Sequence, residues 1–133
     1  MEVKITDNSK LFKNAKDAAV KRALEAIGLT AERHAKEKCP VVTGRLWNSI
    51  THATSEYSGK GSYTDNRGNG FNDANARSTP EDGSVYIGTN VVYAKGIETG
   101  THRKKGAAHF LRDAASQHSD EYKRIIEENL KGS

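Results

Sequence analysis

Apolar residues recur at helical spacing in two long stretches of the chain. The first runs from Lys10 to Lys38 and contains no proline. Its apolar positions are three or four residues apart, which predicts a helix with one apolar face, ended by Pro40. Gly28 lies on this stretch and indicates either a bend or tight packing against a neighbour. The positions are Val20, Leu24, Ile27, Ala31 and Ala35.

The second stretch predicts one long helix near the end of the sequence, followed by Gly132. Nine residues trace a single face of it. They are Phe110, Leu111, Ala114, Ala115, His118, Tyr122, Ile125, Ile126 and Leu130.

Strands are expected between these helices and before the first of them. Residues 1–6, 49–57 and 84–88 read as strands, and residues 91–98 read as a short helix. Thr43 is placed to cap a short turn through Trp47. We therefore expect a single α+β domain over residues 1–133, in which an antiparallel sheet packs against a long N-terminal helix and a C-terminal helix.

The segment from Ser58 to Gly83 differs from the rest in being polar and rich in glycine. Such a segment buries too little apolar surface to offset its ordering entropy. We expect residues 58–83 to form a long, flexible and mobile arm between two strands.

Composition narrows the class of protein. The chain has 133 residues, of which 35% are apolar and 29% charged, with a net charge of +4. No apolar run approaches the roughly 20 residues that span a bilayer, and the start lacks a signal-peptide pattern. Cys39 is the single cysteine, so an internal disulfide is excluded. We expect a protein made in the cytoplasm, without contact to a membrane.

A search for catalytic and metal-binding patterns finds none that is specific. The five histidines are not spaced as a helical zinc site, and His118 reads as a partly buried residue of the apolar face. No nucleophile has an activating sequence context, and the stretch from Asp65 to Ala76 lacks the ligands of a calcium loop. We therefore expect no catalytic residues, no metal and no cofactor, and predict that the chain is not an enzyme.

A short basic loop offers one alternative. His102, Arg103, Lys104 and Lys105 follow one another, with Arg112 nearby. A patch this short favours a solvated loop, but a nucleic-acid-binding accessory protein remains an alternative function.

Three segments in fixed order carry a more specific pattern. They are Cys39–Ile50 (CPVVTGRLWNSI), Val85–Thr101 (VYIGTNVVYAKGIETGT) and Phe110–Ala114 (FLRDA). Together they resemble the tail-component family of siphophages and prophages, also called minor capsid or neck proteins. Its members typically read P-V-D-T-G-x-L-x-x-S-I, then V-G-T-x-x-x-Y-A-x-Y-V-E-F-G-T, then P-F-L-R-P-A.

The resemblance implies a structural virion protein that acts in head–tail joining or tail completion, as a ring. Its partners would be head–tail connector, tail-tube or tail-terminator proteins, with transient contact to the DNA backbone as a further option. The candidate structural or interface residues are Thr43, Gly44, Arg45, Tyr93, Glu98, Gly100, Phe110 and Arg112. Among them, Arg45 could pair with a carboxylate such as Glu98, and Glu98 could pair with Arg112 within one subunit or between two.

The chain also departs from the family pattern at several positions. Val42, Gly96 and Thr99 stand where the family has aspartate, tyrosine and phenylalanine, and His109 and Asp113 replace two prolines. The polar arm reads as an insertion. These differences bear on the partners rather than on the family resemblance.

Overall fold

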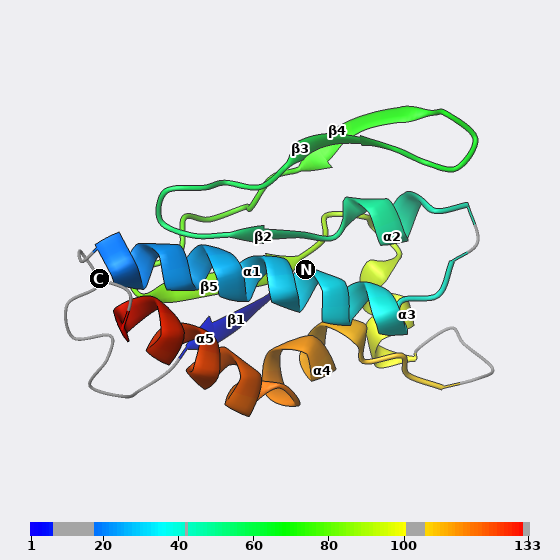
Figure 1. The fold of residues 1–133 in the computed structure, drawn as a ribbon. Coiled ribbons are helices and arrows are strands. Elements are labelled where there is room, and N and C mark those ends of the chain that lie inside the picture. The colour runs from blue at the N-terminus through cyan, green and yellow to red at the C-terminus, as the bar shows by residue number, and fades with distance from the viewer. Residues whose placement is uncertain (7–17, 42, 101–105, 132–133) are drawn as a thin grey trace.

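The computed structural model describes residues 1–6, 18–41, 43–100 and 106–131 (Figure 1). The fold is α+β, with a long N-terminal and a C-terminal helix against antiparallel strands, as predicted. The helices are α1 (Ala18–Lys38), α2 (Arg45–Ser49), α3 (Ala94–Thr99), α4 (Phe110–Ser116) and α5 (Ser119–Lys131). The strands are β1 (Glu2–Thr6), β2 (Thr51–Ala53), β3 (Gly61–Thr64), β4 (Gly70–Ala74) and β5 (Ser84–Gly88).

The main sheet has three strands in the order β1-β5-β2. The central strand β5 is antiparallel to both neighbours, with Ile87 opposite Val3 on one side and opposite His52 on the other. Helix α1 packs on β5 and β2, and α4 packs on β1, so the helices form a layer over one face of the sheet (Figure 1).

Alternation along β5 sends its apolar side chains into this helical layer. Val85 and Ile87 are fully buried. Val85 belongs to a small cluster with Val20 and Leu24 of α1, whereas Ile87 joins the main core with Ile27. The apolar positions predicted from the spacing in the first helix are therefore its buried face.

Helix α1 and strand β2 are also joined by a buried histidine. Its ring lies against Gly28, so the tight packing expected at this glycine is present. His52 Nδ1 is 2.7 Å from Glu32 Oε1, and its Nε2 is 2.8 Å from Glu25 Oε2. Burial lowers the pKa of His52, but hydrogen bonds to the two glutamates outweigh it and raise the pKa above its usual value. Each ring nitrogen faces a carboxylate oxygen, which can only accept a hydrogen bond, so the site stabilises the doubly protonated imidazolium.

Residues 58–83 connect β2 to β5, as expected of the arm, but the segment does not lack regular structure, because it contains a β-hairpin. Strands β3 and β4 form a two-stranded antiparallel sheet, in which Tyr63 lies opposite Phe71 with their rings stacked. Asp65 closes the turn by accepting hydrogen bonds from the backbone N–H groups of Arg67 and Asn69. Local turn chemistry and one aromatic pair thus order a segment that buries little.

Two predicted elements have different bounds. The strand expected over residues 49–57 is limited to β2, because Ser49 ends α2 and Thr54 turns back to pair with Tyr57. The single C-terminal helix is divided between Ser116 and Ser119. The hydroxyl of Tyr122 donates to the carbonyl of Ala114, the acceptor that residue 118 would use in a continuous helix. The helix start expected at residues 7–17 lies outside the described residues.

Candidate assembly interface

The three sequence segments that carry the family resemblance lie together at one end of the molecule. In Figure 1, α2, α3 and the start of α4 gather at the same end, although they are far apart in the sequence. Ser49 Oγ and Thr89 Oγ1, both buried, are 2.6 Å apart and join the first segment to the second. Phe110 of the third segment is fully buried in the core that the other two also supply. Residues of the three motif segments therefore pack into one structural unit.

Glu98 connects the second segment to the third. Its side chain is buried, and Oε2 accepts hydrogen bonds from the backbone N–H groups of Leu111 at 2.8 Å and Arg112 at 3.3 Å. The carboxylate thus binds N–H groups that the first turn of α4 leaves unpaired. Burial raises the pKa of Glu98, and these two hydrogen bonds oppose the change. Its other oxygen, Oε1, has no hydrogen-bond partner among the described residues.

The ion pairs proposed between Glu98 and the side chains of Arg45 and Arg112 are not formed within the chain. Arg45 Nη2 is 3.3 Å from Asp73 Oδ2, and its guanidinium lies 4.2 Å from the centre of the Phe71 ring. Arg45 therefore contacts the β3–β4 hairpin, and its side chain does not pair with Glu98. The Arg112 side chain is 3.2 Å from Asp113, so only its backbone meets Glu98. Arg45 thus pairs with a carboxylate, as expected, but with Asp73 in place of Glu98. The expected intramolecular Glu98–Arg112 side-chain pair is wrong.

Thr43 and Gly44 form the turn that starts α2. Thr43 Oγ1 accepts a hydrogen bond from the N–H of Arg45, two residues on, and its carbonyl accepts one from Asn66 of the hairpin turn. The N-cap of α2 is Gly44, so Thr43 forms the preceding turn and not the expected side-chain cap. Gly44 has a φ of 83° and would place a Cβ atom 2.4 Å from the Asn66 side chain. A glycine is needed here for both reasons. Gly100 ends α3 in the same left-handed conformation, with a φ of 80°.

The replacements of the two family prolines have local structural effects. His109 has a φ of 50°, which the ring of proline excludes, and its N–H donates to the carbonyl of Glu98. Asp113 is buried and lies 2.6 Å from Lys38 Nζ. The hydrogen bond from Lys38 lowers the pKa of Asp113. This pair ties α4 to the end of α1, and sequence reasoning missed it because the partners are 75 residues apart.

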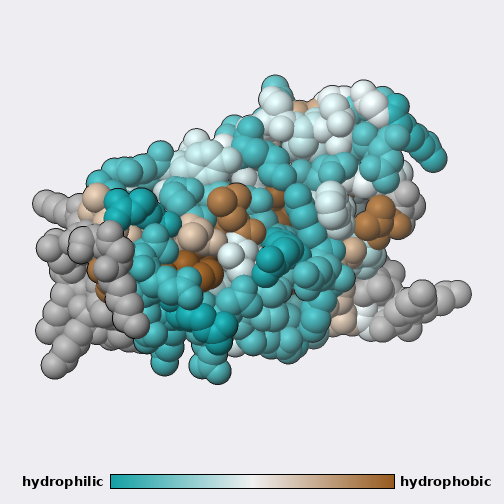
Figure 2. Space-filling model, in the orientation of Figure 1, coloured by the Kyte–Doolittle hydropathy of each residue, from teal (hydrophilic) through white to brown (hydrophobic). Residues whose placement is uncertain are grey.

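Exposed apolar side chains occur on the same two segments. Val41 is 55% exposed, Val92 is 87% exposed and Tyr93 is 42% exposed. Figure 2 shows that apolar residues on the viewed face are few and surrounded by hydrophilic ones. These three side chains are the exposed large apolar residues among the described positions of the motif segments, which makes them the candidates for contact with a partner. We refer to Val41, Val92 and Tyr93 as the apolar rim.

Comparisons with known proteins do not indicate a family or a function for the chain. No family model, curated protein or solved structure matches it. No helix in the described ranges is long and apolar enough to cross a membrane. The basic loop His102–Lys105, on which the alternative of nucleic-acid binding depends, lies outside the described residues.

Proposed function

We propose that the chain is a non-enzymatic structural protein of a tailed bacteriophage or prophage, which acts in head–tail joining or tail completion. The observation that carries the proposal is the convergence of the three motif segments into one packed unit, held by Glu98 and by the Ser49–Thr89 contact. A motif that is scattered along the sequence but contiguous in space is what a shared structural role requires.

The partners follow from the resemblance and from the apolar rim. Val92 and Tyr93 precede α3 on the surface, where they are available to a neighbouring subunit. Head-to-tail contacts between identical subunits close into rings, the form suited to a portal or tail end. The proposed partners are copies of the same chain and connector, tail-tube or tail-terminator proteins of the virion, after assembly in the host cytoplasm.

Complementation of a gene deletion tests this function. Electron microscopy of lysates from the deletion is expected to show filled heads separate from tails, and wild-type protein is expected to restore virions. Val92→Asp is expected to fail in restoring virions while remaining folded by circular dichroism. Leu29→Asp is the matched control, because Leu29 is 60% exposed on α1, outside the motif segments.

Two results would overturn the proposal. Normal virions from the deletion would exclude a role in assembly, and normal virions with Val92→Asp would exclude the apolar rim as the contact surface. DNA binding that falls steeply with salt and disappears when the basic loop is neutralised would favour the nucleic-acid-binding alternative.

A further inference from the structure

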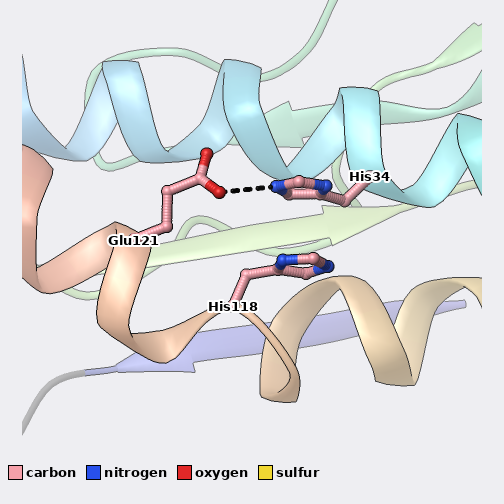
Figure 3. Close-up of side chains that lie close together, drawn as sticks. All are labelled: His34, His118 and Glu121. Atoms are coloured by element: carbon pink, nitrogen blue, oxygen red, sulfur yellow. Dashed lines mark hydrogen bonds and ion pairs between the residues drawn. The ribbon is translucent and has the colours of Figure 1, made fainter.

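Two histidines and a glutamate from distant parts of the sequence meet where α1 packs beside α5. His34 comes from α1, His118 from the turn between α4 and α5, and Glu121 from the first turn of α5 (Figure 3). His34 Nε2 is 3.2 Å from Glu121 Oε2. One ligand atom from each of the three residues lies within 4.8 Å of the other two.

The two imidazole rings are stacked face to face. Their centres are 3.5 Å apart and their planes differ by 3°. Figure 3 shows the rings one above the other, with the Glu121 carboxylate pointing toward His34. Stacking of this kind gains little from charge, because two protonated imidazoles at this distance would repel. The arrangement instead places two imidazole nitrogens and one carboxylate oxygen side by side.

His34 carries an independent sign that the cluster is incomplete. Its side chain is 9% exposed, and Nδ1 has no hydrogen-bond partner within the described ranges of the chain. The nearest carboxylate oxygen, on Glu37, is 3.6 Å from this nitrogen. A buried ring nitrogen without a partner is costly, so the hydrogen-bonding capacity of the cluster is not fully used by the described residues.

Glu121 is oriented by a second contact. Arg33 Nη2 donates to Oε1 at 3.2 Å, which leaves Oε2 directed at His34. A carboxylate fixed through one oxygen and offered through the other is a common arrangement around metal ligands. The cluster thus has two imidazoles, one oriented carboxylate and a partly exposed side formed by His118.

We propose that His34, His118 and Glu121 bind a divalent zinc ion that joins α1 to α5. Imidazole and carboxylate are both zinc ligands, and three protein ligands leave a fourth position for water. Parallel rings direct their lone pairs side by side and not to one point, so binding rotates the ring of His118. That ring lies in a turn and is only partly buried, so it is the one free to rotate.

This site is independent of the proposed role in virion assembly. It faces the contact of α1 with α5, whereas the apolar rim lies on the segments around α2 and α3. Loss of zinc binding would therefore leave the assembly proposal untouched, and the reverse also holds.

Calorimetric titration of the full chain with Zn²⁺ at neutral pH tests the site. We expect one ion per chain, with His118→Gln and Glu121→Gln each weakening the affinity by at least about tenfold. Because the ion would bind only the folded chain, Zn²⁺ should raise the Tm of the wild type and not that of His118→Gln. Co²⁺ should give the visible absorption of a four-coordinate ion.

His109→Gln is the control, since His109 lies outside the cluster, and it should bind Zn²⁺ as the wild type does. The His118 and Glu121 variants keep the test decisive even if His34→Gln does not fold, because both residues are only partly buried. Absence of binding by the wild type would overturn the proposal. Equal affinity in the wild type and His118→Gln would overturn it as well.

Discussion

The imidazole ring of His52 lies directly against the backbone of Gly28, and a Cβ atom at position 28 would be 2.3 Å from His52 Cδ2. Helix α1 therefore approaches strand β2 as closely as it does because residue 28 has no side chain. The approach in turn brings both Glu25 and Glu32 to the ring of His52. The spacing of one glycine and two glutamates on α1 thus sets the position of the helix on the sheet.

Gly28→Ala should destabilise the protein although alanine is the better helix former. The helix preference favours alanine by about 1 kcal/mol, but overpacking against a buried ring costs about 1–3 kcal/mol. The extra methyl group must displace the ring of His52 from its two glutamates, so we expect an overpacking cost in the upper part of that range. Urea unfolding measures the difference.

Gly70→Ala is the matched control for this substitution. A Cβ atom at Gly70 meets nothing within 4 Å. Its free energy of unfolding should change by no more than about 0.5 kcal/mol. A Gly28→Ala variant as stable as this control would contradict the packing described here.

The His52–Glu32 pair predicts a stability optimum in mildly acidic solution. The pKa of His52 is raised in the folded state, so its contribution is complete below its usual value of 6.5 and is lost as the pH rises through the folded pKa. Burial raises the pKa of Glu32, but hydrogen bonds from His52 outweigh this and the pKa is lowered. The Glu32 contribution is complete above its usual value of 4.5 and is lost as the pH falls.

Both contributions are therefore present between about pH 4.5 and 6.5. Denaturant unfolding across pH 4–9 should show the free energy of unfolding decreasing above this window. His52→Gln should be less stable and should lose much of the decrease at high pH. Stability that rises steadily from pH 6 to pH 9 in the wild type would contradict the charged form of His52.

Glu98→Ala should destabilise α4 through the loss of a helix cap. Removal of the carboxylate leaves the N–H groups of Leu111 and Arg112 without their acceptor, and a lost cap costs about 0.5–2 kcal/mol. Glu98→Gln retains an acceptor oxygen and should be closer to the wild type. Arg112→Ala is the control, with an expected change within about 0.5 kcal/mol, because its exposed side chain does not meet Glu98. A larger loss in Arg112→Ala than in Glu98→Ala would reverse this assignment.

Arg45→Ala should loosen the hairpin while leaving the main sheet intact. Arg45 contacts Asp73 and the ring of Phe71, both on β4, so its removal takes away one anchor of the two-stranded sheet. Hydrogen exchange is expected to become at least about tenfold faster in residues 61–74 and to remain unchanged in β5. The matched control is Arg67→Ala in the hairpin turn, where only the backbone N–H makes a hydrogen bond to Asp65. Uniform acceleration across the chain would show that Arg45 supports the whole fold.

The helices and the main strands could be predicted from the sequence because each depends on a local pattern. The apolar face of α1 and the alternation in β5 are set by neighbouring residues, and both are present. The hairpin could not be predicted in this way, since its stability depends on Arg45, Phe71 and the Asp65 turn acting together. The break before α5 likewise depends on a single hydroxyl, that of Tyr122.

The sequence named candidate interface residues, but it did not indicate the contacts that these residues make. Glu98 and Phe110 were expected to be important, and both are buried where the motif segments meet. The groups that they contact belong to other elements of the fold: the Glu98 carboxylate, for example, accepts a hydrogen bond from the N–H of Leu111. The contact between His34 and His118 was also missed, because the search for metal-ligand spacing compares only residues on the same helix.

Helix α1 makes polar contacts with three of the elements packed against it: Glu32 with β2, His34 with α5 and Lys38 with α4. The backbone carbonyl of Lys36 also accepts a hydrogen bond from the Trp47 indole of α2. Separation of α2, α4, α5 or β2 from the helix would therefore break a hydrogen bond made by α1. Heat should consequently unfold the helices and the main sheet in one all-or-none transition, with equal calorimetric and van't Hoff enthalpies.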